Sequence, residues 1–153
     1  MPEIVIDVNV FEHCNNQSCK FGPSSVEMCT KLLDSDLCLC IDDVFNVMES
    51  SNTSWIASEY YERIHVGMIG YPILMHLLTN RNVVQIEKSK YLKVKKSIKS
   101  KMHHHNDWVY ALVAAASVGK LLVTNDYDDF NQSFRQWMKN EHSVSVLDTL
   151  EMA

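Results

Sequence analysis

Short runs of β-branched and apolar residues alternate with longer amphipathic segments, and this alternation constrains the fold more than any other feature of the chain. The predicted strands are residues 3–8, 37–41, 83–86, 121–124 and 144–147. The predicted helices are residues 24–33, 54–66, 71–78, 88–102, 107–118 and 130–139. A strand, a helix and a second strand in succession favour a right-handed crossover, which packs helices on both faces of a parallel sheet. We therefore predict an α/β fold with three layers, α/β/α, around a mainly parallel central sheet.

Length and composition predict a single domain that covers residues 1–153. Domains typically contain about 100–150 residues, and 46% hydrophobic with 22% charged residues is an ordinary globular composition. No apolar run approaches the roughly 18 residues that span a bilayer, and Met1 to Val10 lacks the basic start of a signal peptide. The five cysteines are an odd number, which favours reduced thiols. We expect a cytoplasmic protein with no membrane partner.

The basic residues are concentrated in one segment. Seven of the fourteen Lys and Arg residues lie between Lys88 and Lys101, and no acid lies among them. That segment carries +7, and because the whole chain carries −5, the remainder carries −12. Four apolar residues recur in this segment at helical spacing: Tyr91, Val94, Ile98 and Met102. A helix docked through this stripe presents its lysines outward, either as a solvated face or as a patch that contacts phosphate groups.

Carboxylates fall where a sheet of this kind builds its sites. Three predicted strands end at an aspartate (Asp7, Asp42 and Asp126), and Asp107 begins a helix. Sites in open parallel α/β sheets lie at the carboxyl ends of the strands, where the strand order reverses. Carboxylates that meet there raise one another's pKa unless a cation compensates, and their oxygens suit one or two Mg²⁺ or Mn²⁺ ions. Such ions activate water against a phosphoryl group, so these acids beside a lysine patch indicate phosphodiester hydrolysis.

Two motifs carry a more specific signal. The first is Ile4-Val-Ile-Asp7-Val-Asn9-Val-Phe11, a strand that ends in Asp-x-Asn. The second begins with Asp107 at the head of an Ala-rich helix, then passes Gly119 and an apolar strand to Thr124-Asn-Asp126-Tyr-Asp-Asp129-Phe130. Together they resemble the PIN-domain family of metal-dependent ribonucleases, which includes the VapC-type toxins. The resemblance spans residues 4–130 and implies a PIN-like fold in which Asp7, Asp107 and Asp126 bind the metal.

The family's remaining ligand is a Glu on the helix after the second strand, where Glu59 and Glu62 are candidates. The apolar stripe of that helix consists of Ile56, Tyr60 and Ile64. At 100° per residue, Glu59 flanks the stripe, whereas Glu62 points nearly opposite. We choose Glu59, and Asp42 is the substitute if Glu59 does not complete the site.

Other residues are expected to support these ligands. Asp129 is either an additional metal ligand or the N-cap of the helix that starts near Phe130. Asn9 and Thr124 are expected to orient the ligands or to satisfy turn backbone. The residues expected to contact the RNA backbone are Lys93, Lys95, Lys96 and Lys99.

These observations predict a Mg²⁺- or Mn²⁺-dependent endoribonuclease that hydrolyses single-stranded or looped RNA. Its catalytic residues would be Asp7, Glu59, Asp107 and Asp126. The family resemblance also implies a toxin neutralised by a cognate antitoxin protein, and a homodimer. The alternative is a catalytically inactive PIN-like RNA-binding or scaffold domain that keeps the lysine patch and uses its acids structurally.

Overall fold

The computed structural model describes residues 2–43, 54–79, 83–102 and 108–152. Within them, the five predicted strands are present and alternate with seven helices, one more than predicted. The strands are β1 (Glu3–Ile6), β2 (Cys38–Asp42), β3 (Val83–Ile86), β4 (Leu121–Val123) and β5 (Ser145–Leu147). The helices are α1 (Val8–His13), α2 (Gly22–Leu33), α3 (Trp55–Arg63), α4 (Gly70–Thr79), α5 (Lys88–Lys99), α6 (Trp108–Ala116) and α7 (Gln132–His142). The α/β class is confirmed.

All pairings in the sheet are parallel, in the order β3-β2-β1-β4-β5. The chain builds β1, β2 and β3 outward in one direction, then crosses back to place β4 on the other side of β1. In register, Val5 pairs with Leu122 and Ile6 pairs with Val123. The strand order therefore reverses between β1 and β4, where doubly wound sheets bind their ligands.

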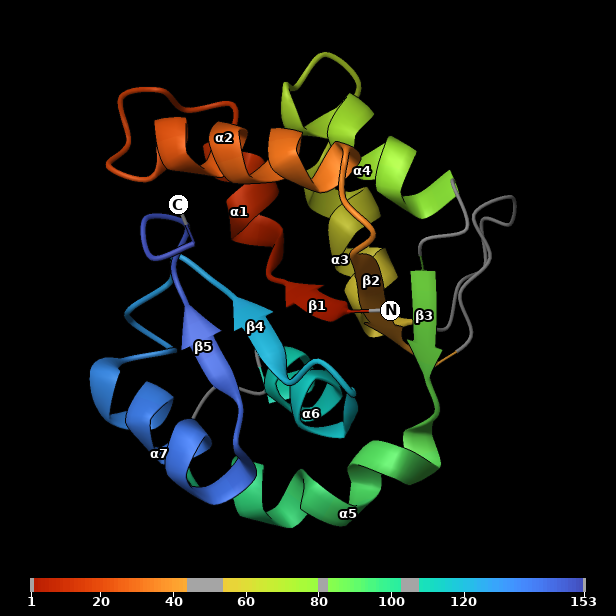
Figure 1. Ribbon diagram of the computed structural model, residues 1–153, viewed down its shortest axis with the longest axis vertical. Helices are drawn as coiled ribbons and strands as arrows, with labels where there is room; N and C mark the ends of the chain where they lie inside the picture. The colour runs from red at the N-terminus through yellow and green to blue at the C-terminus, as the bar shows by residue number, and fades with distance from the viewer. Residues whose placement is uncertain (1, 44–53, 80–82, 103–107, 153) are drawn as a thin grey trace.

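The helices form a layer on each face of the sheet. Helices α1 to α4 gather on one side and α5 to α7 on the other, as right-handed crossovers in this strand order require (Figure 1). Every residue of β2 is buried, which is expected of a parallel strand covered on both faces. Of the predicted apolar stripe, Tyr91 and Ile98 on α5 and Met102 just after it are buried, and Val94 is partly buried. Within the described segments, no helix is both long and apolar enough to cross a bilayer.

Most boundaries differ from the sequence prediction by one to three residues, and capping explains two of the differences. The first strand ends at Ile6 rather than residue 8, because Asp7 accepts a hydrogen bond from the Asn9 amide and starts α1, a helix that the sequence did not predict. The last helix is capped by Asn131, whose side chain accepts from the Phe134 amide, rather than by Asp129.

Candidate functional site

The first and fourth strands deliver two of the predicted acids to the same place. The Asp7 amide donates to the Val123 carbonyl at 3.0 Å, so Asp7 lies level with the end of β4. The Thr124 hydroxyl donates to Asp7 Oδ2 at 2.8 Å and accepts from the Asp126 amide at 3.1 Å. One hydroxyl thus links Asp7 to Asp126 at the position where the strand order reverses.

Asn9 adds a second link between the two strand ends. Its side-chain amide donates to Asp7 Oδ2 at 3.3 Å and to Thr124 Oγ1 at 3.4 Å. Its carbonyl oxygen accepts from the Asn125 amide at 3.3 Å. Both residues predicted to orient ligands therefore contact the Asp7 carboxylate directly.

Asp7 is a carboxyl group largely withdrawn from water, with only 3% of its surface exposed. The pKa of Asp7 is raised from 3.8 to about 7, mainly by burial and to a smaller extent by the charge of Asp126. The hydrogen bonds from Thr124 and Asn9 and the charge of Arg63 oppose this rise in pKa without cancelling it. A buried carboxylate beside a second carboxylate is stabilised by any cation that can reach both.

Asp126 lies in the turn that follows β4, and this turn fixes one of its oxygens. Asp126 Oδ1 accepts from the amides of Asp128 at 2.8 Å and Asp129 at 3.1 Å. Its other oxygen, Oδ2, makes no hydrogen bond to any described residue. The turn therefore orients the Asp126 carboxylate and leaves one oxygen available to a ligand.

Glu59 is half-buried on α3, on the flank of the stripe that the sequence indicated. The stripe residues Ile56, Tyr60 and Ile64 are all buried. Oε1 of Glu59 is 3.3 Å from Nη1 of Arg63. Nη2 of the same guanidinium is 2.5 Å from Oε1 of Glu12. Arg63 thus joins Glu59 to an acid on α1 that the sequence reasoning missed.

The signal for Arg63 was present in the sequence, because Glu59 and Arg63 are spaced i,i+4 on a predicted helix. Glu12 could not be recognised in the same way, since the helix that carries it was not predicted. Arg63 is near enough to Asp7 for its charge to lower the pKa of that carboxyl. The guanidinium is therefore a cation supplied by the chain itself at the edge of the acidic site.

Asp42, the substitute for Glu59, has a structural role. It accepts hydrogen bonds from the Ser54 hydroxyl at 2.6 Å and from the amides of Trp55 at 2.7 Å and Ile56 at 2.9 Å. These amides belong to the first turn of α3, which otherwise lacks partners. Asp42 thus ties the start of α3 to the end of β2 with both of its oxygens.

Asp107 lies outside the described residues. Helix α6, which follows it, brings Tyr110 to the site, where the Tyr110 hydroxyl accepts from the Val8 amide at 3.2 Å. Among the described residues, no group of three or more His, Cys, Asp or Glu side chains is placed to hold a metal ion. The described residues therefore bring Asp7 and Asp126 together but do not group Glu59 with them; Glu59 is linked to the pair through Arg63, whose charge lowers the pKa of Asp7.

The predicted RNA-binding lysines lie on α5, and two of them lie over an aromatic ring. The Nζ atoms of Lys95 and Lys99 are 5.3 Å and 4.7 Å from the centre of the Trp108 ring. Trp108 begins α6, two residues before the tyrosine that contacts Val8. An open hollow of about 510 Å³ is lined by Leu92, Lys95, Lys96, Lys99 and Ser100. The lysine face therefore contacts the start of α6, the helix whose Tyr110 binds the Val8 amide next to Asp7.

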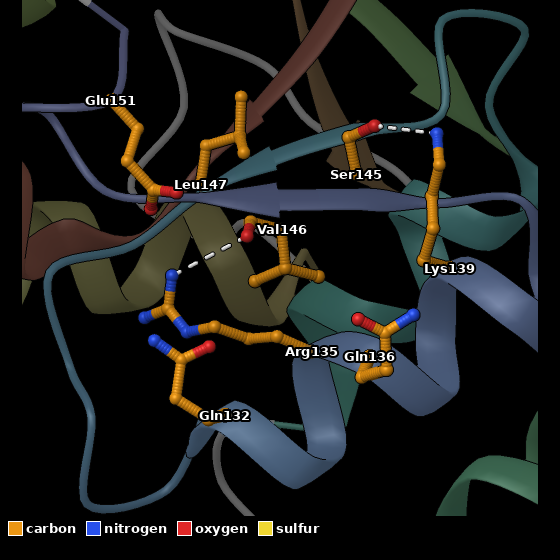
Figure 2. Close-up of a pocket in the computed structure, with 8 residues that line it drawn as sticks. All are labelled: Gln132, Arg135, Gln136, Lys139, Ser145, Val146, Leu147 and Glu151. Atoms are coloured by element: carbon orange, nitrogen blue, oxygen red, sulfur yellow. Dashed lines mark hydrogen bonds between the residues drawn. The ribbon is translucent and has the colours of Figure 1, made fainter.

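A separate pocket of about 280 Å³ lies between α7 and β5 and contains none of the predicted acids (Figure 2). Arg135 lines this pocket, with Lys139 and Glu151 at other positions around it. The sequence reasoning assigned no role to these residues.

A scan of protein-family models finds no match to this chain, and a search of curated proteins finds none either.

Proposed function

We propose that this protein is a Mg²⁺- or Mn²⁺-dependent endoribonuclease that hydrolyses phosphodiester bonds in single-stranded or looped RNA. The observation that carries the proposal is the desolvated Asp7 carboxyl, linked through Thr124 to Asp126 at the point where the strand order reverses. Burying a carboxylate in this way is costly unless a cation or a proton compensates it. A divalent cation bound at this site would compensate the cost of burying the carboxylate.

Asp7 and Asp126 would hold the ion, and Asp107 and Glu59 would complete its ligands. When bound, the ion would polarise the phosphoryl group and lower the pKa of the attacking water. Thr124 and Asn9 hold the Asp7 carboxylate in one orientation. Glu59 is half-buried and forms an ion pair with Arg63, whose charge also acts on Asp7, so Glu59 would orient the water and accept its proton once released from that arginine.

The lysine face of α5 is the surface we assign to the RNA backbone. Its residues Lys93, Lys95, Lys96 and Lys99 supply positive charge in a chain whose net charge is −5. Neutralisation of phosphates by lysines releases counterions and provides affinity without sequence specificity. Because the hollow also contains the exposed side chain of Leu92, it suits unpaired nucleotides whose bases have an apolar face.

We further propose that the protein is a PIN-like nuclease. The proposal rests on the two sequence motifs, together with an all-parallel sheet in the order β3-β2-β1-β4-β5. We also propose that it is the toxin of a toxin–antitoxin pair, that a cognate antitoxin protein binds it, and that it forms a homodimer. We propose that it is located in the cytoplasm, where the five free thiols would remain reduced.

A second candidate is a catalytically inactive PIN-like domain that binds RNA or serves as a scaffold. The ion pair between Glu59 and Arg63 favours it, because a carboxylate already neutralised by the chain needs no metal. In that case the lysine face would be retained and the acids would be structural.

Cleavage of an end-labelled single-stranded RNA in Mg²⁺ or Mn²⁺ separates the two candidates. The enzyme should cleave only with a divalent ion, and Asp126→Asn should abolish cleavage while RNA binding survives. Asp128→Asn is the matched control, because Asp128 is an exposed acid in the same turn and its substitution makes the same change in charge. Intact RNA binding without cleavage in either ion would identify the inactive domain.

A further inference from the structure

Arg135 is a buried charge with an unusual set of partners. It lies in the first turns of α7 and exposes only 6% of its surface. Within the described part of the chain, its guanidinium forms no ion pair with a carboxylate. It bonds instead to main-chain carbonyl groups, which points to a role in holding the backbone.

The carbonyls that Arg135 holds belong to the turn that carries Asp126. Its Nη2 donates to the carbonyls of Thr124 and Asp126, each at 3.0 Å, and its Nε donates to the Phe130 carbonyl at 2.6 Å. These three carbonyls lie at the beginning, middle and end of the segment between β4 and α7. The guanidinium also lies over the Tyr127 ring, 3.9 Å from its centre.

We propose that Arg135 is the positioning residue that sets the orientation of the Asp126 carboxylate and the Thr124 hydroxyl. The inference rests on the proposed function and names a further residue that this function requires. Arg135 itself touches no substrate. It acts through the Asp126 main chain, whose amide binds Thr124 Oγ1 while its side chain accepts from two amides of the turn.

The chemistry of the guanidinium explains why an arginine serves this role. Its planar fork presents five donors in fixed directions, so one side chain can bind several carbonyls at once. Hydrogen bonds from a charged donor are roughly twice as strong as those between neutral groups. A lysine at this position would carry the same charge on a single nitrogen and could not reach all three carbonyls.

Figure 2 shows Arg135 at the pocket between α7 and β5. The side chain extends from α7 toward β5, and Nη1 lies 3.4 Å from the Val146 carbonyl. The pocket of about 280 Å³ on this side is lined by the same side chain. A small cation from solution can therefore enter the space that a shortened side chain would leave.

Amide hydrogen exchange tests the proposal in the 153-residue protein without a nuclease assay. The Asp128 and Asp129 amides report the turn, since both donate to Asp126 Oδ1. In the unmodified protein they should exchange at least about tenfold more slowly than in an unstructured peptide of the same sequence. In Arg135→Lys they should exchange about tenfold faster than in the unmodified protein, while the amides of β1 and β2 keep their rates.

The matched control is Gln136→Ala, the next residue on α7, whose side chain donates to Asn140 and, among the described residues, makes no bond to the turn. It should leave the turn amides unchanged. Equal acceleration of turn and core amides in Arg135→Lys would show a general stabilising role and overturn the proposal. Unchanged turn amides would overturn it as well, and so would unprotected turn amides in the unmodified protein.

Metal binding and catalysis provide the second readout. Arg135→Lys should weaken Mn²⁺ binding about tenfold by calorimetry and lower kcat about tenfold, with KM for RNA changed less than twofold because the lysine face is untouched. Millimolar guanidinium, well below denaturing concentrations, should restore part of the Mn²⁺ affinity of Arg135→Ala. If the unmodified protein neither binds Mn²⁺ nor cleaves RNA, the proposed function fails, and the exchange rates still decide whether Arg135 positions the turn.

Discussion

The Thr124 hydroxyl donates a hydrogen bond of 2.8 Å to Oδ2 of Asp7, joining the ends of the two central strands. This bond lowers the pKa of Asp7, but burial outweighs it and holds that pKa at about 7. The site therefore contains a carboxyl group that is only half-ionised near neutral pH. Its protonation and its capacity to bind a cation are linked.

Asp7→Asn should stabilise the apo-protein at alkaline pH. The folded pKa of about 7 lies above the reference value of 3.8, so Asp7 carries no penalty below pH 3.8. The penalty grows as pH rises between these two values and is complete above the folded pKa. Removing the ionisation should add up to about 4 kcal/mol to the unfolding free energy at pH 8 and nothing near pH 3.5. The Asn amide also places a donor against the Asn9 and Thr124 donors, which costs about 1–3 kcal/mol at both pH values, and urea denaturation measures the sum.

The control for that experiment is Asp128→Asn, which makes the same change in charge at an exposed position of the nearby turn. It should change stability by less than about 0.5 kcal/mol at either pH. A variant at Asp7 that is less stable than the parent at pH 8 would contradict the assigned pKa.

Divalent ions should stabilise the protein in a pH-dependent way. Mn²⁺ must displace the proton of Asp7, so its affinity should fall about tenfold between pH 8 and pH 6, as expected for one competing proton with a pKa of about 7. Thermal unfolding across a Mn²⁺ titration measures the effect, because a ligand that binds the folded state raises Tm. The control is thermal unfolding in a Ca²⁺-free buffer that contains K⁺ as its only metal ion. An affinity independent of pH would exclude Asp7 as a ligand.

Arg63→Gln should strengthen Mn²⁺ binding several-fold at pH 8. The substitution removes a positive charge near the site and releases Glu59, whose Oε1 is 3.3 Å from Arg63 Nη1. Calorimetry at pH 8 limits the opposing effect of a higher Asp7 pKa in the variant, because the charge of Arg63 is the smallest of the causes that set that pKa. Arg63→Lys retains the charge and is the matched control. Weaker binding in Arg63→Gln would show that the arginine holds Glu59 in a productive position rather than competing with the metal.

Asp42→Asn should lower stability and leave metal binding unchanged. The amide would place a donor against one of the three donors that now converge on Asp42: the Ser54 hydroxyl and the amides of Trp55 and Ile56. We expect a loss of about 1–3 kcal/mol in urea denaturation, the usual cost of removing a helix cap or leaving a buried donor unpaired. The neighbouring Asp43→Asn should cost much less. Loss of Mn²⁺ binding in Asp42→Asn would instead make Asp42 the missing ligand.

The double variant Lys93→Gln with Lys96→Gln should weaken binding of single-stranded RNA about five- to tenfold in 100 mM salt. A plot of the logarithm of the binding constant against the logarithm of the salt concentration should become less steep by roughly 1.4, since each phosphate contact with a single strand contributes about 0.7 to the slope. Fluorescence anisotropy with catalytically silent Asp126→Asn as the parent measures both quantities. Lys31→Gln with Lys139→Gln removes the same charge elsewhere and should leave both nearly unchanged. Equal effects of the two double variants would show that only net charge matters.

Much of the architecture followed from local patterns. The β3 boundaries, Val83–Ile86, match the prediction, and the buried stripe of α5 was indicated by helical spacing alone. The positions of Asp7 and Asp126 at strand ends could also be predicted, because apolar strand residues followed by an aspartate are visible in the chain. Their meeting at one rim followed from the parallel topology that strand–helix alternation implies.

The partners of those acids were decided only by the tertiary structure. Glu12 and Arg63 are brought together from α1 and α3, and Arg135 reaches back from α7 to the Thr124 and Asp126 carbonyls. Asp42 resembled a site acid in the sequence, yet the start of α3 uses both of its oxygens. Periodicity reports which side of an element is buried, since that depends on residues three or four positions away. Which charged group lies opposite depends on how separate elements pack, and no local pattern in the chain records that packing.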